Sequence, residues 1–101
     1  MLVLKHIDNE YPGLTLRTLA QQLDLNGSYL SRVISRDLRC TFLDLLHCRR
    51  ILAAVEALRM PRRELSLDDI ACQLGYSSLH YFYCVFKNYT GLTPAKAREL
   101  I

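Results

Sequence analysis

The sequence predicts an all-α fold of seven helices, arranged as two similar lobes joined by a long helix. Apolar residues recur at helical spacing along the 101 residues, half of which are hydrophobic, and the helix-breaking residues Gly and Pro number only 4 and 3. The apolar pattern of residues 16–23 returns 51 positions later, in residues 67–74. This repeat divides the chain into a first lobe at 1–40, a linker helix at 41–60 and a second lobe at 61–101.

The first lobe is expected to open with a short amphipathic helix over residues 1–11. Leu4 and Ile7 are its expected inward residues. Pro12-Gly13 ends it, because Pro cannot continue the hydrogen-bond ladder and Gly tolerates a reversal of the chain.

The next two helices are expected to form a helix-turn-helix. Thr15 caps the helix at 16–23, whose apolar residues lie at the i, i+3, i+4, i+7 spacing of one buried face. A turn at 24–27 leads to a helix over residues 28 to about 38. The expected inward residues of this helix are Leu30, Val33 and Ile34, and its outward residues are Ser28, Ser31, Arg32, Ser35 and Arg36.

A long linker helix is expected from residue 41 to Arg59. Thr41 is its N-cap, and Asp44 completes a near capping box and places an acid at the positive helix end. Its apolar residues occur on more than one side, as expected for a helix packed between two lobes. Met60-Pro61 ends the helix, and residues 62–65 form a basic link.

The second lobe repeats the helix-turn-helix. Ser66 caps the helix at 67–74, and Asp68 and Asp69 stand in its first turn, where the helix dipole favours acids. Gly75 then makes the turn.

Two further helices complete the second lobe. Ser77 or Ser78 caps the first of them, and Gly91 supplies its left-handed stop. Thr93-Pro94 opens the last helix, because Pro at the first helical position loses no hydrogen bond. The expected inward residues of the helix before Gly91 are Tyr81, Phe82, Val85, Phe86 and Tyr89.

Two copies of this motif indicate DNA binding. In a helix-turn-helix the first helix holds the second against the duplex, where the exposed face of the second enters the major groove. The copies are offset by 51 residues in their first helices and 52 in their second. A linker helix of about 27 Å would place the two reading helices, in homeodomain-like lobes, roughly one DNA turn or 34 Å apart.

The motifs of the second lobe are Ile70-Ala71, Gly75-Tyr76, Tyr81-Phe82, Phe86-Lys87, Gly91, Pro94 and Arg98. Those of the first lobe and linker helix are Ser28-Tyr29-Leu30-Ser31-Arg32, Arg50-Ile51, Ala54 and Leu58. In these motifs essentially the whole chain resembles the DNA-binding domain of the AraC/XylS family of bacterial transcription regulators. The resemblance implies double-stranded DNA and RNA polymerase as partners, activation as the commoner role, and an N-terminal sensing or dimerisation domain outside this chain.

Two sites depart from the family pattern. Arg39 stands where a Gly normally closes the first reading helix, so either it takes a left-handed conformation at a cost near 1 kcal/mol or the exit differs. Cys84, after Tyr83, stands where the family often has Arg and cannot make a bidentate contact to guanine. Lys and Arg outnumber acids 10 to 7 through Glu64 and equal them, 3 to 3, beyond it. We therefore expect the second lobe to hold phosphates more than it reads bases.

Arg32 is the first choice for a base contact, because it lies mid-helix on the outward face; the alternative is a solvated or phosphate-bound Arg. The candidates for base readout are Asn26, Ser28, Ser31, Arg32, His80 and Tyr83. The candidates for phosphate contact are Ser35, Arg36, Ser77, Ser78, Lys87 and Asn88. For Arg49 and Arg50 on the linker helix, pairing with an acid such as Asp68 or Asp69 is expected at least as much as a DNA contact, so they are left out of the base-reading set.

Other functional classes are disfavoured. The chain leaves little room for a catalytic pocket and carries no catalytic motif, so neither an enzyme nor a cofactor is expected. His80 and Cys84 stand at i, i+4, but no four-ligand metal set can be assembled. No apolar run is long enough to span a membrane. Four cysteines without framework spacing, three of them at positions suited to small apolar residues, favour a reducing cytosol.

The sequence thus predicts a cytoplasmic, sequence-specific DNA-binding domain. The alternative is a helical protein-interaction module that has lost DNA binding. Tyr83, Cys84 and the neutral second lobe favour that alternative.

Overall fold

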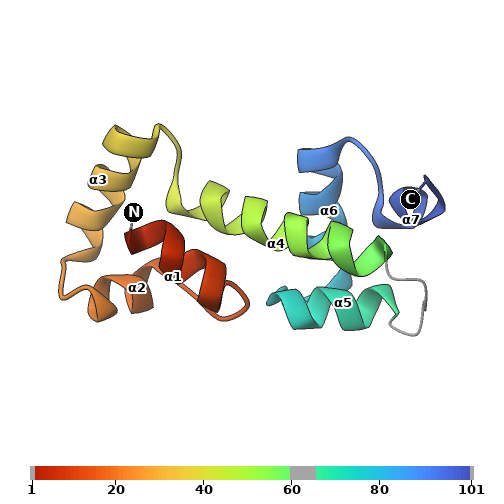
Figure 1. The fold of residues 1–101 in the computed structure, drawn as a ribbon, viewed down its shortest axis with the longest axis horizontal. Helices are drawn as coiled ribbons and strands as arrows, with labels where there is room; N and C mark the ends of the chain where they lie inside the picture. The colour runs from red at the N-terminus through yellow and green to blue at the C-terminus, as the bar shows by residue number, and fades with distance from the viewer. Residues whose placement is uncertain (1, 60–65, 101) are drawn as a thin grey trace. The chain divides into compact units, whose positions relative to one another are not determined.

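The computed structural model describes residues 2–59 and 66–100, and this part of the chain holds seven α-helices and no strand (Figure 1). The helices are α1 (Leu2–Glu10), α2 (Leu16–Gln22), α3 (Gly27–Leu38), α4 (Phe42–Arg59), α5 (Leu67–Leu74), α6 (Leu79–Thr90) and α7 (Pro94–Leu100). The chain divides into two compact units, Met1–Arg49 and Arg50–Ile101, so α4 contributes to both. The all-α prediction is confirmed, whereas the expected stop at Met60-Pro61 and the link at 62–65 lie outside the described residues.

The first unit has one apolar core. Its buried members are Val3, Ile7, Leu14, Leu19, Ala20, Leu30, Ile34, Phe42 and Leu46. In α1 the prediction that Leu4 faces inward is wrong: Leu4 is 39% exposed, whereas Val3 and Ile7 are buried. Residues four apart share a helix face, and Val3, Ile7 and Tyr11 form that row against the core.

Capping side chains fix where α2 and α3 begin. The Oγ1 atom of Thr15 accepts from the backbone N–H of Thr18 at 3.1 Å, and the Thr18 hydroxyl accepts from the N–H of Thr15 at 3.1 Å. This reciprocal pair confirms Thr15 as the cap. The helix α3 begins at Gly27, one residue earlier than predicted, because the side chain of Asn26 supplies its cap.

The two units leave their helices through different left-handed residues. After α2 and α3 the first unit uses Asp24 (φ 55°) and Arg39 (φ 57°). After α5 and α6 the second unit uses Gly75 (φ 98°) and Gly91 (φ 80°). Of the two alternatives for Arg39, the structure therefore shows the left-handed one, a conformation that favours glycine by about 1 kcal/mol.

The long helix α4 carries apolar side chains around most of its circumference. Thr41 Oγ1 accepts from the N–H of Asp44 at 3.0 Å, and an Asp44 carboxylate oxygen accepts from the N–H of Thr41 at 3.2 Å. The predicted capping box is confirmed. Buried residues of α4 include Phe42, Leu46, His47, Arg50, Ile51, Ala54 and Leu58. Leu43 and Leu52 are more than half exposed.

The two arginines in the middle of α4 are held in different units. In the first unit, the Nε atom of Arg49 lies 3.1 Å from the carboxylate of Asp8, and its guanidinium stacks 4.6 Å from the ring centre of Tyr11. In the second, the buried Arg50 lies 5.0 Å from the ring centre of Tyr76. The acid paired with Arg49 is thus Asp8 rather than Asp68 or Asp69, because α1 packs in the same unit.

The helices of the second unit are also capped by side chains at their N-termini. Ser66 and Asp69 form a reciprocal capping box at α5, with N–H···O distances of 3.1 and 3.3 Å. Of the two serines considered for α6, Ser78 is the cap, because its Oγ atom accepts from the N–H of Tyr81 at 3.0 Å. Thr93 Oγ1 accepts from the N–H of Lys96 and so caps α7.

In α6 the buried stripe is narrower than predicted. Phe82, Val85 and Phe86 are buried, but Tyr81 and Tyr89 are 40% and 37% exposed, so their inward assignment is wrong. Tyr81 instead lies at the border of the stripe, edge-on to the ring of Tyr76 at 5.2 Å between centroids.

Candidate nucleic-acid interface

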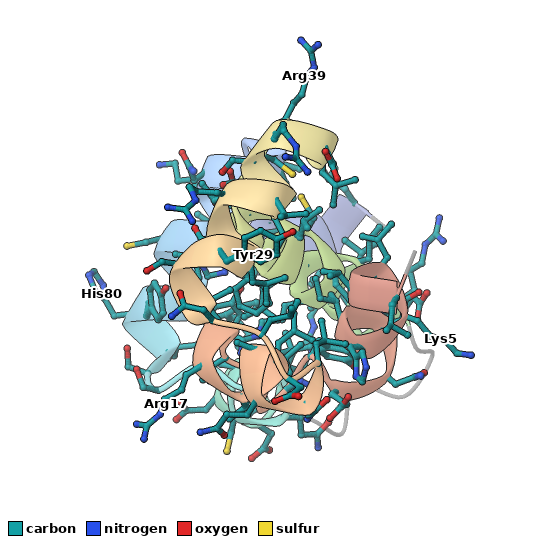
Figure 2. All side chains as sticks on the ribbon, turned by 90° about the vertical axis from the view of Figure 1, so that its left-hand side faces the viewer. Lys5, Arg17, Tyr29, Arg39 and His80 are labelled. Atoms are coloured by element: carbon teal, nitrogen blue, oxygen red, sulfur yellow. The ribbon has the colours of Figure 1, made fainter. Side chains whose placement is uncertain are left out.

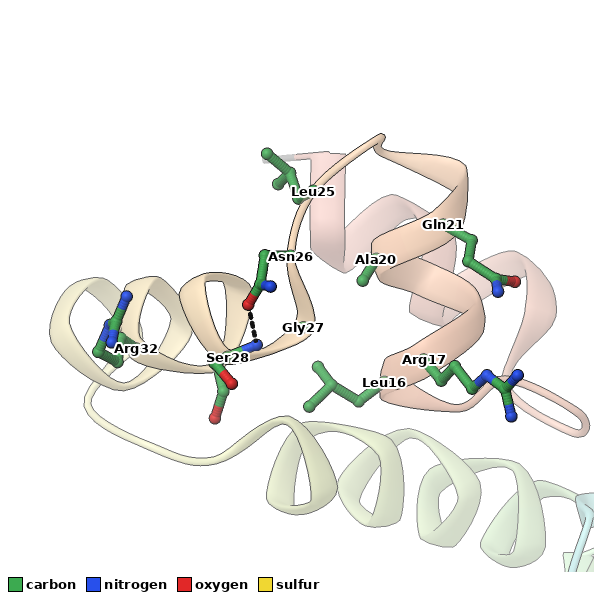
Figure 3. Close-up of a pocket in the computed structure, with 10 residues that line it drawn as sticks. Leu16, Arg17, Ala20, Gln21, Leu25, Asn26, Gly27, Ser28 and Arg32 are labelled. Carbon is green, nitrogen blue, oxygen red and sulfur yellow. Dashed lines mark hydrogen bonds between the residues drawn. The ribbon is translucent and has the colours of Figure 1, made fainter.

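A shallow hollow lies between α2 and the start of α3; we call it the α2–α3 hollow (Figure 3). Arg17 on α2 and Arg32 on α3 stand on its two sides, and Leu16 and Ala20 lie on the α2 side between them. Its charged groups are therefore both cationic, and a guanidinium can bind phosphate or the edge of guanine in bidentate fashion.

Four of the six predicted base-reading residues line this hollow: Asn26, Ser28, Ser31 and Arg32. Ser28 and Arg32 are exposed, whereas Ser31 is half-buried. Among the described residues, no hydrogen bond or ion pair holds the side chain of Arg32. Its guanidinium donors are thus available to a ligand.

Asn26 has a structural role beside any contact with DNA. Its Oδ1 atom accepts from the N–H group of Ser28 at 2.8 Å (Figure 3) and from that of Tyr29 at 3.3 Å. Because this oxygen is occupied, only the amide NH₂ of Asn26 is available to a base.

The two phosphate candidates on α3, Ser35 and Arg36, are exposed. The Nε–H of Arg36 donates to the carboxylate of Asp37 at 2.9 Å, and this hydrogen bond raises the pKa of the guanidinium. A phosphate that binds Arg36 would therefore compete with Asp37 or use the remaining donors of the guanidinium.

Arg17 was not among the sequence candidates. It is exposed on the first turn of α2 and shares the hollow with Arg32. The repeat carries the signal that could have identified it, because the 51-residue offset pairs Arg17 with Asp68. The two units thus differ by two charges at one position.

The corresponding hollow of the second unit, the α5–α6 hollow, is acidic. Asp68 and Asp69 line it together with Ser77 and Ser78, which are exposed phosphate candidates. Two carboxylates beside these hydroxyls would repel a phosphate group. The hydroxyl of Ser78 is also engaged as the α6 cap.

The remaining candidates of the second unit lie along α6. His80, Tyr83 and Lys87 line one hollow with Cys84, and Asn88 is exposed one residue beyond Lys87. The Sγ atom of Cys84 lies 3.7 Å from Nε2 of His80. This surface carries a single formal positive charge, at Lys87.

The cysteines are free, and those on α4, α5 and α6 (Cys48, Cys72 and Cys84) are exposed, so they do not occupy buried small-residue positions. In the described part of the chain no group of three or more His, Cys, Asp or Glu side chains could hold a metal ion. None of its helices combines the length and apolarity needed to cross a membrane.

Residues 19–100 match a family model described as a helix-turn-helix domain. The chain is 32% identical over 87 residues to the probable transcription factor PqrA of Proteus vulgaris, which spans 86% of this chain and 70% of PqrA. It is 33% identical over 90 residues to the transcriptional regulatory protein YesN of Bacillus subtilis, of which it covers 24%. The chain therefore spans most of one relative and about a quarter of the other.

Solved structures share the fold. The C-terminal domain of AraT, a response regulator from Geobacillus stearothermophilus, matches with a TM-score of 0.89 and 33% identity, over 98% of this chain and 82% of that chain. The DNA-binding domain of AdpA, solved in complex with a target DNA, matches with a TM-score of 0.82 and 21% identity, over 94% of this chain and 84% of that chain. The chain belongs to the helix-turn-helix family of AraC-type transcription regulators, as a DNA-binding domain of that type.

Proposed function

We propose that this domain binds double-stranded DNA sequence-specifically, and that α3 of the first unit is the principal reading helix. The observation that carries the proposal is the α2–α3 hollow, which is lined by Arg17, Arg32 and the exposed Ser28 and by no acidic side chain. In this arrangement Arg32 contacts a base edge and Arg17 a backbone phosphate.

The second unit has a supporting role in this proposal. Its α5–α6 hollow holds Asp68 and Asp69, and Cys84 stands at the position that Arg32 occupies in the first unit. Lys87 and Asn88 on α6 contact phosphates, whereas His80 and Tyr83 make at most minor base contacts. We infer that the second unit adds affinity with little sequence preference.

The domain acts by binding rather than by catalysis, and in the cytoplasm. The two reading helices address successive major-groove segments from subdomains at 1–40 and 61–101 with the linker helix at 41–60. From the usual organisation of the family, we further propose that the domain activates transcription through RNA polymerase. We also propose an N-terminal sensing or dimerisation domain outside this chain.

The test is a titration of duplex DNA, selected for binding from a random pool, at two salt concentrations. A DNA-binding domain is expected to show an affinity that falls steeply with salt, by about 3.5-fold per phosphate contact between 50 and 200 mM. Lys87→Ala should weaken binding evenly across sequences. Failure to select any duplex, with little binding at either salt concentration, would instead support the protein-interaction alternative that the acidic α5–α6 hollow favours.

A further inference from the structure

We propose that Arg39 is an additional DNA-backbone contact of the first unit, held at a strained position for the sake of its charge. The proposal rests on the proposed function, because it names a phosphate ligand within the same DNA complex. It goes beyond that function by assigning a role to Arg39, which stands where the second repeat has Gly91.

The backbone of Arg39 is the first argument. Arg39 ends α3 in the left-handed conformation, with φ 57° and ψ 33°. Its counterpart at the end of α6 is Gly91, with φ 80° and ψ −3°. A Cβ atom built on Gly91 meets nothing within 4 Å, so the glycine there serves backbone conformation and not close packing. A residue with a side chain at a left-handed helix end lowers the stability of the fold, so its presence calls for a functional explanation.

Asp24 shows that the argument is specific to Arg39. Asp24 is the other non-glycine residue with positive φ in the described chain, at 55°, and its counterpart is Gly75. Aspartate enters the left-handed region several-fold more often than most residues, because its short polar side chain bonds locally. Arginine has no such preference, so only Arg39 calls for a functional explanation.

The position of Arg39 is the second argument. Ser28, Arg32, Ser35 and Arg39 follow one another at spacings of four, three and four residues, so their Cα atoms form one row along α3. The row begins at the α2–α3 hollow and ends at a second hollow lined by Ser35, Arg36, Arg39, Cys40, Thr41 and Asp44. The Asp44 carboxylate, the one acidic group of this second lining, accepts from the backbone N–H of Thr41. A duplex that lies on this row passes from the base-reading residues to Arg39.

The availability of its charge is the third argument. The guanidinium of Arg36 donates to Asp37 at 2.9 Å, but no hydrogen bond or ion pair in the described chain holds that of Arg39. Figure 2 shows the Arg39 side chain extending away from the end of α3 into solvent. A free guanidinium offers parallel N–H donors that fit the oxygens of a phosphodiester. Arg39 is therefore the more available cation of the second hollow.

The decisive experiment measures stability and DNA affinity together for Arg39→Gly. Glycine removes the left-handed strain, so the melting temperature should rise by about 2–5 °C after the entropy cost of glycine is allowed for. The loss of one phosphate contact should weaken binding about three- to tenfold near 100 mM salt and reduce the salt slope by about 1. Arg39→Lys keeps both charge and strain, and should match the wild type in melting temperature and salt slope.

Two variants serve as matched controls, with selected duplex DNA as the probe in fluorescence anisotropy. Asp24→Gly makes the same exchange at the other left-handed position, where aspartate is better tolerated than arginine, so it should change the melting temperature less than Arg39→Gly does, without weakening binding. Lys5→Ala removes one positive charge from α1, where the Lys5 side chain extends to the right in Figure 2 while that of Arg39 extends upward, and should leave affinity within about twofold.

The remaining outcomes contradict the proposal in distinguishable ways. If Arg39→Gly binds like the wild type while Arg32→Ala loses binding, Arg39 makes no DNA contact and the proposed function stands. Equal losses of DNA affinity from Arg39→Gly and Lys5→Ala would show that Arg39 contributes only to the overall positive charge of the domain. A fall in both melting temperature and affinity for Arg39→Gly would show that the residue stabilises the fold. If the wild type itself binds no duplex, the proposed function fails as well.

Discussion

Replacing Asn26 by Ala should destabilise the domain by removing the cap of α3, the proposed reading helix. The Asn26 oxygen accepts two backbone N–H groups, at 2.8 and 3.3 Å, and both hydrogen bonds are exposed. Water can therefore rehydrate the freed donors, which keeps the cost near the middle of the range for lost N-caps, about 1 kcal/mol. For a chain of this size that is a fall in melting temperature of about 4–8 °C.

The assay separates the cap from a base contact by adding Asn26→Ser. Serine is as good a cap as asparagine, so this variant should melt close to the wild type although it lacks the amide. If Asn26 acts mainly as a cap, Asn26→Ser should also keep the wild-type preference for a selected DNA site over a shuffled one. Asn26→Ala should lose affinity for the selected site, because the frayed first turn carries Ser28.

Calorimetry or thermal circular dichroism, together with anisotropy on the two duplexes, measures both effects. An Asn26→Ala variant that melts with the wild type would refute the capping argument. An Asn26→Ser variant that keeps its stability but no longer distinguishes the duplexes would show that the amide reads a base.

Two further outcomes follow from the charges and the thiols. Asp68→Arg gives the second unit the counterpart of Arg17, so DNA affinity should rise several-fold and the salt slope should steepen by about 1; unchanged affinity would show that the α5–α6 hollow lies away from DNA. Although Cys48 is exposed, partial desolvation of its thiol, and secondarily the Asp44 carboxylate, raises the pKa of that thiol. At pH 8 Cys48 therefore holds less thiolate than an ordinary cysteine, and it should react with iodoacetamide more slowly than Cys72, which is also exposed. Site-resolved mass spectrometry measures both rates, and faster labelling of Cys48 would contradict this order.

Much of the fold follows from local chemistry that a sequence displays. Thr15, Thr41 and Ser66 were identified as caps because a hydroxyl followed three residues later by a side chain that can bond back is a local pattern. Gly91 was identified as a stop for the same kind of reason. All seven helices of the described chain were expected near their observed positions.

The predictions of burial and of ion-pair partners are wrong where packing between helices determines them. Leu4 and Val3 are both apolar neighbours on α1, and only the core of the first unit determines that Val3 is buried. Tyr81 and Tyr89 are amphipathic, so their rings can lie at the border of a buried stripe as readily as inside it. The acid beside Arg49 comes from α1, a partner that no local pattern indicates.

The site was only partly predictable for a related reason. The helical spacing of the apolar residues in α3 predicts which of its residues face outward, and these include Ser28, Ser31 and Arg32. Arg17 lies on a different helix, and becomes part of the same surface only when α2 packs against α3. The acidic character of the α5–α6 hollow likewise depends on which side of α5 faces the start of α6.

The central claim, that α3 of the first unit reads the DNA sequence, is tested most directly by comparing Arg32→Ala with Cys84→Ala on a selected duplex and a shuffled duplex. The two residues occupy the same position in the two repeats, so each variant is the control for the other. We predict that Arg32→Ala reduces the free-energy preference for the selected duplex by about 1–3 kcal/mol, and that Cys84→Ala leaves it unchanged. An undiminished preference in Arg32→Ala, or an equal loss in Cys84→Ala, would contradict the account.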